Sequence, residues 1–158
     1  MKFIDMWEAG YNFINIDETW LGMSDYRRMK WRETGTTNSV PTVLMSPRIS
    51  MIVGVDSNGN SYVTLTQVNS NSGIMQIYFL NLVKKLDKLN ANWREKTVVL
   101  LDGPSYHNSK PTIQVFEQLK IPVMFLAPHS YNVAPAELYF AWFKRDDINP
   151  RKLPQSKR

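Results

Sequence analysis

The sequence predicts one α/β domain in which a mixed sheet carries helices on its faces. Two observations lead to this class: two strand-like segments flank a tight turn in the N-terminal half, and helical and strand-like segments alternate in the C-terminal half. Strands joined by a tight turn pair antiparallel, whereas strands joined through a helix pair parallel. The length of 158 residues fits a single domain of ordinary size.

The N-terminal segments predict a short helix, a strand and a basic insert. Residues 3–9 have a helical composition, and Gly10 follows as a stop. Residues 11–17 carry apolar side chains interrupted by two asparagines, which favours a strand. Residues 24–48 combine five basic residues with threonines and two prolines, without clean periodicity. This composition predicts a basic, loop-like insert.

A hairpin follows the insert. Residues 49–55 predict a buried strand and residues 62–67 predict the strand that returns. Between them, residues 56–60 contain Asn58-Gly59, the strongest hairpin signal in the chain. The three strands up to this point are therefore expected to be consecutive and antiparallel.

The C-terminal half alternates between helices and strands. Apolar residues recur at intervals of three and four from Ser72 to about Leu89, which predicts an amphipathic helix. The continuous apolar run at 97–101 predicts a central strand that is buried on both faces. A helix is expected at 111–119, with Pro111 in its first turn and Ser109 as its cap. A strand at 122–126, a loop at 128–134 and a helix from Pro135 to Lys144 complete the order.

Composition excludes several classes of protein and of site. The chain has no cysteine, so it has neither a disulfide framework nor a thiolate metal site. No apolar run approaches the roughly 20 residues that span a bilayer, and the first ten residues do not resemble a signal peptide. The net charge of +5 mildly favours an anionic partner.

Three acidic residues stand where α/β folds build their sites. Asp17 and Asp102 are expected at strand ends, and Glu137 in the first turn of a helix that follows a strand. Converging carboxylates suit Mg²⁺ or Mn²⁺, and two such ions about 4 Å apart can clamp a phosphodiester. Taken singly, an acid in such a position is more often a cap, a turn residue or a solvated surface group than a functional residue.

Three segments resemble the catalytic blocks of one enzyme family. They are Ile-Asn-Ile-Asp-Glu-Thr-Trp at 14–20, Val-Val-Leu-Leu-Asp-Gly-Pro-Ser-Tyr-His at 98–107, and Leu-Ala-Pro-His-Ser-Tyr-Asn-Val-Ala-Pro-Ala-Glu at 126–137. In order and spacing they are similar to the blocks of DDE transposases of the mariner superfamily and its bacterial insertion-sequence relatives. Asp102 and Glu137 are separated by 34 residues, which is the spacing found in one major branch of this family. The resemblance covers about residues 11–150.

The resemblance implies a ribonuclease-H-like fold with a five-stranded mixed sheet flanked by helices. It also implies that Asp17, Asp102 and Glu137 form a catalytic triad that holds two Mg²⁺ or Mn²⁺ ions. The implied activity is metal-dependent cleavage and transfer of DNA strands. One ion would activate water or a DNA 3′-hydroxyl, and the other would stabilise the leaving oxygen.

The chain departs from the family pattern beside the acids. Gly103 stands where the family usually has Asn, and the usual proline-rich and Leu-Asn-Pro tripeptides are Ala127-Pro128-His129 and Val133-Ala134-Pro135. Family transposases also carry N-terminal helix-turn-helix domains, whereas this chain starts about 16 residues before Asp17. We therefore expect one catalytic domain at 1–150 and a basic tail at 151–158.

Further candidates lie around the triad. His107 matches a histidine of the family block and is expected either to orient a phosphate or carboxylate or to be a loop histidine satisfied by backbone. Glu18 should point to the face opposite Asp17 and is not assigned to metal. A further set of residues is expected either to contact DNA or to form a solvated basic surface. These residues are Arg27, Arg28, Lys30, Trp31, Arg32, Lys144 and Arg145.

Two functions of different classes remain open from sequence. The first is a DNA-cleaving and strand-joining enzyme that contacts the phosphate backbone. The second is a domesticated, non-catalytic module that serves as a subunit of a larger assembly. A nuclease of the same fold that acts on RNA–DNA hybrids or branched DNA is a third, weaker interpretation. Partners would be DNA, a second copy or host chains, and the resemblance implies a nuclear location if the source is eukaryotic.

Overall fold

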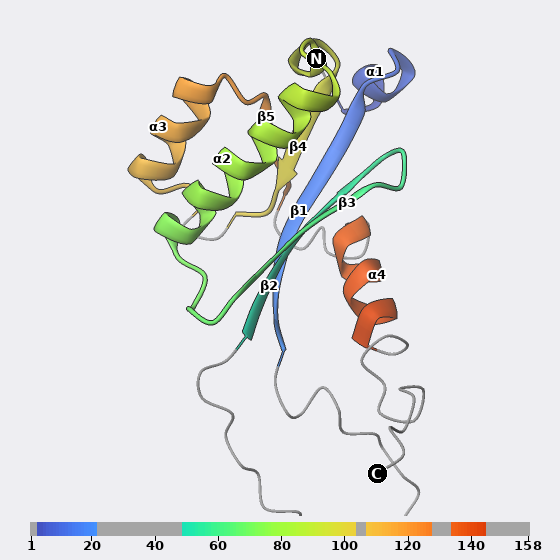
Figure 1. The fold of residues 1–158 in the computed structure, drawn as a ribbon. Coiled ribbons are helices and arrows are strands. Elements are labelled where there is room, and N and C mark those ends of the chain that lie inside the picture. The colour runs from blue at the N-terminus through green and yellow to red at the C-terminus, as the bar shows by residue number, and fades with distance from the viewer. Residues whose placement is uncertain (1–2, 22–48, 104–106, 128–133, 145–158) are drawn as a thin grey trace, which may run out of the picture.

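The computed structural model describes residues 3–21, 49–103, 107–127 and 134–144. These residues include a five-stranded sheet in the order β3-β2-β1-β4-β5 (Figure 1). The strands are β1 (Asn12–Leu21), β2 (Ile49–Asp56), β3 (Ser61–Thr66), β4 (Thr97–Leu101) and β5 (Val123–Phe125). β2 pairs antiparallel with β1 and β3, whereas β4 pairs parallel with β1 and β5. The predicted mixed sheet is confirmed.

Helices cover both faces of this sheet. They are α1 (Phe3–Glu8), α2 (Ser72–Leu89), the short 3₁₀ helix η2 (Trp93–Glu95), α3 (Lys110–Leu119) and α4 (Pro135–Trp142). In Figure 1, α2 and α3 lie on one side of the strands and α4 lies on the other. The predicted helix at 72–89 is confirmed to the residue, and Ser109 occupies the N-cap position of α3 as expected. The sequence pattern did not indicate η2.

Alternation along the strands divides the core between the two faces. On the α2–α3 face, Ile14, Ile16 and Leu101 are buried together with Phe79 and Phe116. The opposite face holds two smaller clusters. In one, Met51 and Val53 of β2 pack against Ala136 and Phe140 of α4. In the other, Met6 of α1 packs against Phe13, Val98 and Leu100.

β1 is longer than the sequence predicted. The expected strand ended at Asp17, but β1 continues to Leu21 because β2 pairs with it through Leu21 opposite Ile49. The prediction that Asp17 stands at a strand end is therefore wrong for the sheet as a whole. Asp17 does follow the last residue of β1 that pairs with β4, because that pairing ends at Ile16 opposite Leu101.

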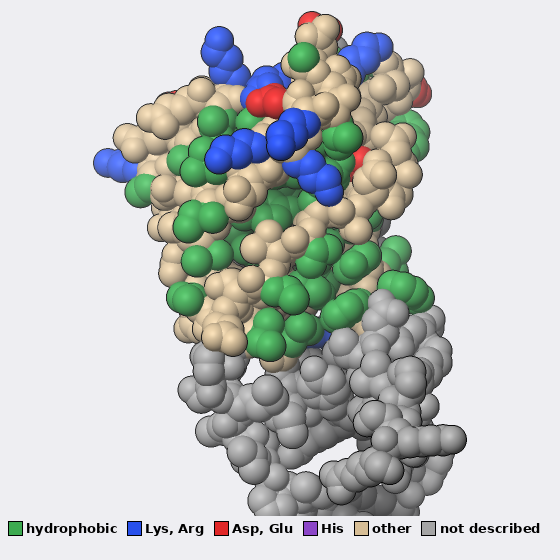
Figure 2. Space-filling model, viewed as in Figure 1, with side chains coloured by type: hydrophobic (Ala, Val, Ile, Leu, Met, Phe, Trp, Pro, Cys, Tyr) green, Lys and Arg blue, Asp and Glu red, His purple; other side chains and the backbone are tan. Residues whose placement is uncertain are grey.

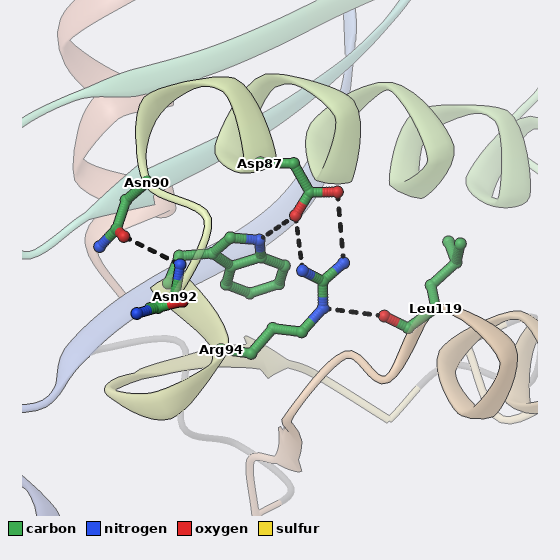
Figure 3. Close-up of polar contacts among 6 residues, drawn as sticks. Asp87, Asn90, Asn92, Arg94 and Leu119 are labelled. Atoms are coloured by element: carbon green, nitrogen blue, oxygen red, sulfur yellow. Dashed lines mark hydrogen bonds and ion pairs between the residues drawn. The ribbon is translucent and has the colours of Figure 1, made fainter.

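A polar network fixes α2 to the elements that follow it (Figure 3). The carboxylate of Asp87 accepts hydrogen bonds from the indole N–H of Trp93, at 2.8 Å, and from the guanidinium of Arg94. Arg94 also donates from Nε to the carbonyl of Leu119 at 3.0 Å. The hydrogen bond from Arg94, followed by that from Trp93, lowers the pKa of the Asp87 carboxyl. This network lies on the α2–α3 side of the sheet.

Basic side chains are distributed unevenly over the described surface. In Figure 2 they gather mainly at the end of the molecule that carries α1 and the C-terminal end of α2, which includes Lys88. The C-terminal part of β1 and α4 lie toward the other end in the same view (Figure 1). The visible basic cluster therefore lies away from the C-terminal part of β1.

Candidate active site

Asp17 lies on the face of the sheet that α4 covers. The residues two positions to either side make side-chain hydrogen bonds to α4 and to the residue two positions after its end. Asn15 Oδ1 accepts from the backbone N–H of Ala136 at 3.0 Å, and Thr19 Oγ1 accepts from Lys144 Nζ at 2.9 Å. Because side chains alternate along a strand, Asp17 points to the same face as Asn15 and Thr19.

Asp102 occupies the corresponding position beside β1. It directly follows β4, whose last residue, Leu101, pairs with Ile16. Asp17 and Asp102 therefore each come one residue after the same parallel pair. About half of the Asp102 side chain is exposed (51%), so it remains accessible to a ligand.

Glu137 comes from a third element. It lies in the first turn of α4, between Ala136 and Phe140, which are both buried against the sheet. The residue itself is exposed. Packing of α4 on the Asp17 face therefore brings the third predicted acid to the same side of the sheet as the first.

Burial and neighbouring acidic residues raise the pKa of the Asp17 carboxyl group. Burial is the largest cause that raises its pKa, although a hydrogen bond from the Glu18 backbone N–H, at 2.8 Å, opposes it. The negative charges of Asp102, Glu18 and Glu137 raise the pKa further, to about 7. The three neighbouring carboxylates disfavour the ionised form of this half-buried carboxyl group. A bound cation would stabilise the ionised form, so this is a candidate cation site.

His107 is fully buried and lies between two carboxylates. Its Nε2 is 2.8 Å from Glu18 Oε1, and its Nδ1 is 2.9 Å from Asp102 Oδ1. Burial alone would lower the pKa of His107, but the hydrogen bonds and charges of Asp102 and Glu18 outweigh it and raise the pKa to about 10. The ring is therefore an imidazolium at neutral pH, which donates to both acids.

Glu18 has a role that the sequence did not reveal. Its neighbour Asp17 faces α4, whereas Glu18 reaches the imidazole of His107 and its side chain is only 7% exposed. This fits the expectation that Glu18 points away from Asp17. No spacing rule links residues 18 and 107, which lie 89 positions apart. The sequence signal was limited to two acids in succession followed by a distant histidine.

The carboxylate side chains of the site are of a type that suits a hard divalent cation. Among the described residues, no group of three or more His, Asp or Glu side chains is arranged to hold a metal ion. Carboxylate oxygens are nevertheless the ligands that Mg²⁺ and Mn²⁺ prefer. Burial and, to a smaller extent, the charges of Asp102, Glu18 and Glu137 raise the pKa of Asp17.

Of the residues predicted to contact DNA, the structure describes only Lys144. Residues 27–32 and Arg145 lie outside the described residues. Lys144 is described: it is half-buried and donates to Thr19 beside Asp17. The expected insert at 24–48 and the tail at 151–158 likewise lie outside the described residues.

A family comparison identifies the class of domain. The model of the DDE superfamily endonuclease domain matches residues 12–158. The chain belongs to this family. A comparison with curated protein sequences found no significant match.

Solved structures of the Mos1 mariner transposase resemble the chain in fold. The paired-end complex with the left transposon end aligns at a TM-score of 0.66 and 18% identity, covering 90% of this chain and 44% of the other. The paired-end complex with Mn gives 0.67 and 16%, covering 93% and 46%. The isolated Mos1 catalytic domain gives 0.65 and 17%, covering 90% and 64%. The expected ribonuclease-H-like fold is confirmed, and the chain spans less than half the length of the chains in the two paired-end complexes.

The described helices give no sign of a membrane segment. None of those within the described ranges combines the length and the apolar character that crossing a bilayer requires.

Proposed function

We propose that this chain is the catalytic domain of a transposase-type endonuclease that cleaves and transfers DNA strands with Mg²⁺ or Mn²⁺. The observation that carries the proposal is the environment of Asp17. A half-buried carboxyl on β1 has its pKa raised to about 7 by burial and by the charges of Asp102, Glu18 and Glu137. Membership of the DDE endonuclease family supports the assignment of Asp17, Asp102 and Glu137 as the metal-binding catalytic residues.

Each acid would contribute through its own surroundings. Asp17 is held by the Glu18 backbone N–H, which directs one carboxylate oxygen. Asp102 directs one oxygen to His107 and keeps about half of its side chain exposed for a ligand. Glu137 approaches from α4 as an exposed carboxylate. Two divalent ions, when bound, supply an activated attacking oxygen and stabilise the leaving oxygen of the phosphodiester.

His107 would orient Asp102 and carry no metal itself. Both of its ring nitrogens are engaged by carboxylate oxygens within 3 Å, and the ring is buried. A protonated imidazole donates and cannot ligate a cation. Its positive charge also offsets part of the repulsion between acids that converge without metal.

DNA is the proposed partner, held through its phosphate backbone. Complexes of Mos1 with transposon ends support this class of partner. The candidate contacts are basic residues that follow Asp17 or α4 in the sequence, namely Arg27, Arg28, Lys30, Arg32, Lys144 and Arg145. Trp31 is a candidate for stacking on a base. A second copy of this chain or a host chain is a further candidate partner, and a eukaryotic source would place the substrate in the nucleus.

Plasmid nicking tests this proposal. The purified chain is incubated with supercoiled plasmid in Mg²⁺, in Mn²⁺ or in EDTA, and the relaxed product is quantified. The expected result is relaxation with either metal and none with EDTA. A folded chain that leaves the plasmid intact at high concentration in both metals contradicts the proposal. That result would favour the domesticated, non-catalytic module, which should co-purify with partner chains in fixed stoichiometry.

A further inference from the structure

Asn15 is the polar exception in the buried part of β1. Its neighbours Phe13, Ile14 and Ile16 are apolar and buried, and Asn15 itself is only 3% exposed. A buried amide costs free energy unless it is hydrogen-bonded. Asn15 Oδ1 meets this requirement by accepting from the backbone N–H of Ala136 at 3.0 Å, across 121 residues of sequence.

The helix that receives this contact has no cap of its own. The first backbone N–H groups of any helix lack intrahelical acceptors, and a polar side chain at the N-cap usually satisfies one of them. The N-cap of α4 is Ala134, whose side chain makes no capping hydrogen bond. Asn15 therefore caps α4 from another element, and the capped amide belongs to the residue directly before Glu137.

A second contact fixes the other end of the helix on the same strand. Lys144 Nζ donates to Thr19 Oγ1 at 2.9 Å. Four residues of strand, from Asn15 to Thr19, extend about 13 Å. From Ala136 to Lys144, which lies in the helical turn that continues α4, eight residues extend about 12 Å. The two lengths match, so α4 lies along β1.

Asp17 lies midway between the two contacts. We propose that Asn15 is a positioning residue, which holds the first turn of α4 at the height on β1 where Glu137 faces the acids of the site. The importance of this placement for metal binding rests on the proposed function, whereas the placement itself does not. The burial of Ala136 and Phe140 against β2 holds α4 to the sheet, and the hydrogen bond from the Ala136 N–H to Asn15 Oδ1 adds a directional contact with β1.

Two variants and one control separate this role from ordinary stability. Asn15→Leu keeps the side-chain size and removes the acceptor. Asn15→Asp keeps an oxygen acceptor. The control is Asn71→Ala, which removes a comparable N-cap, since Asn71 Oδ1 accepts from the Ile74 N–H at 3.1 Å at the start of α2. The measurements are amide hydrogen exchange of Ala136, Mn²⁺ affinity by calorimetry, and thermal unfolding.

The expected results differ between the variants. Asn15→Leu should speed exchange of the Ala136 amide and weaken Mn²⁺ binding by about tenfold or more. Asn15→Asp should restore the slow exchange. Asn71→Ala should lower the melting temperature without changing Mn²⁺ affinity.

Two results would overturn the inference. One is unchanged exchange of the Ala136 amide in Asn15→Leu, and the other is fast exchange with wild-type Mn²⁺ affinity. If the wild-type chain neither binds Mn²⁺ nor nicks DNA, the proposed function fails. Hydrogen exchange alone then decides whether Asn15 holds α4.

Discussion

Asp102→Asn should abolish metal-dependent nicking of DNA. The substitution keeps the size of the side chain and removes a negative charge beside Asp17, directly after the neighbouring strand β4. Metal ions supply several kcal/mol of charge stabilisation to such reactions. Loss of even about 3 kcal/mol slows a reaction more than 100-fold, because about 1.4 kcal/mol corresponds to a factor of ten. The assay is relaxation of supercoiled plasmid in Mn²⁺, compared with the wild-type chain.

The matched control for this prediction is Asp87→Asn. It makes the same chemical change at an exposed acid on α2, whose partners are Arg94 and Trp93 on the α2–α3 side of the sheet. Because surface ion pairs contribute little, it should fold and nick like the wild-type chain. Wild-type nicking by folded Asp102→Asn would show that the activity arises elsewhere or from a contaminant.

His107→Gln should destabilise the fold by about 3–5 kcal/mol, as breaking one partner of a buried ion pair does. The imidazole has no exposed surface, and its partner Glu18 is almost as buried. Removing the ring leaves the Glu18 carboxylate without this positive neighbour in a medium of low polarity. The measurement is urea-induced unfolding of the two proteins.

The effect of His107→Gln should depend on pH. The folded-state pKa of His107, about 10, lies above its ordinary value of 6.5. The stabilisation by the imidazolium is therefore fully present below about pH 6.5 and is lost as the pH rises through about 10. The difference between wild type and variant should shrink accordingly. Adding Glu18→Gln to the variant should recover part of the loss, because both members of the pair are then neutral. Equal stability of wild type and His107→Gln at pH 6.5 would contradict the ion pair.

Most of the fold could be predicted from local patterns, because most elements carry their own signal. The apolar positions of 72–89 repeat at helical spacing, and Asn58-Gly59 stands in the hairpin turn with Gly59 at φ +82°. The uninterrupted apolar run 97–101 became a strand that is buried along its whole length. β1 was predicted too short, because the pairing that extends it to Leu21 comes from β2 across a long insert.

The sequence indicated the candidate acids and not the contacts that support them. Asp17, Asp102 and Glu137 belong to recognisable blocks, so the resemblance proposes them as the site residues. The contacts of Glu18 with His107, and of Asn15 with Ala136, join residues 89 and 121 positions apart. Neither contact follows from periodicity or spacing, since the first joins β1 to the segment after β4 and the second joins β1 to α4.

Anomalous diffraction from crystals of the chain soaked in Mn²⁺ tests the central claim most directly. That claim is that Asp17, Asp102 and Glu137 together hold the metal that the reaction needs. We expect two anomalous peaks about 4 Å apart, bounded by these three carboxylates. Mn²⁺ bound elsewhere, with no peak beside Asp17 and Asp102 although both are open to solvent in the crystal, would contradict it.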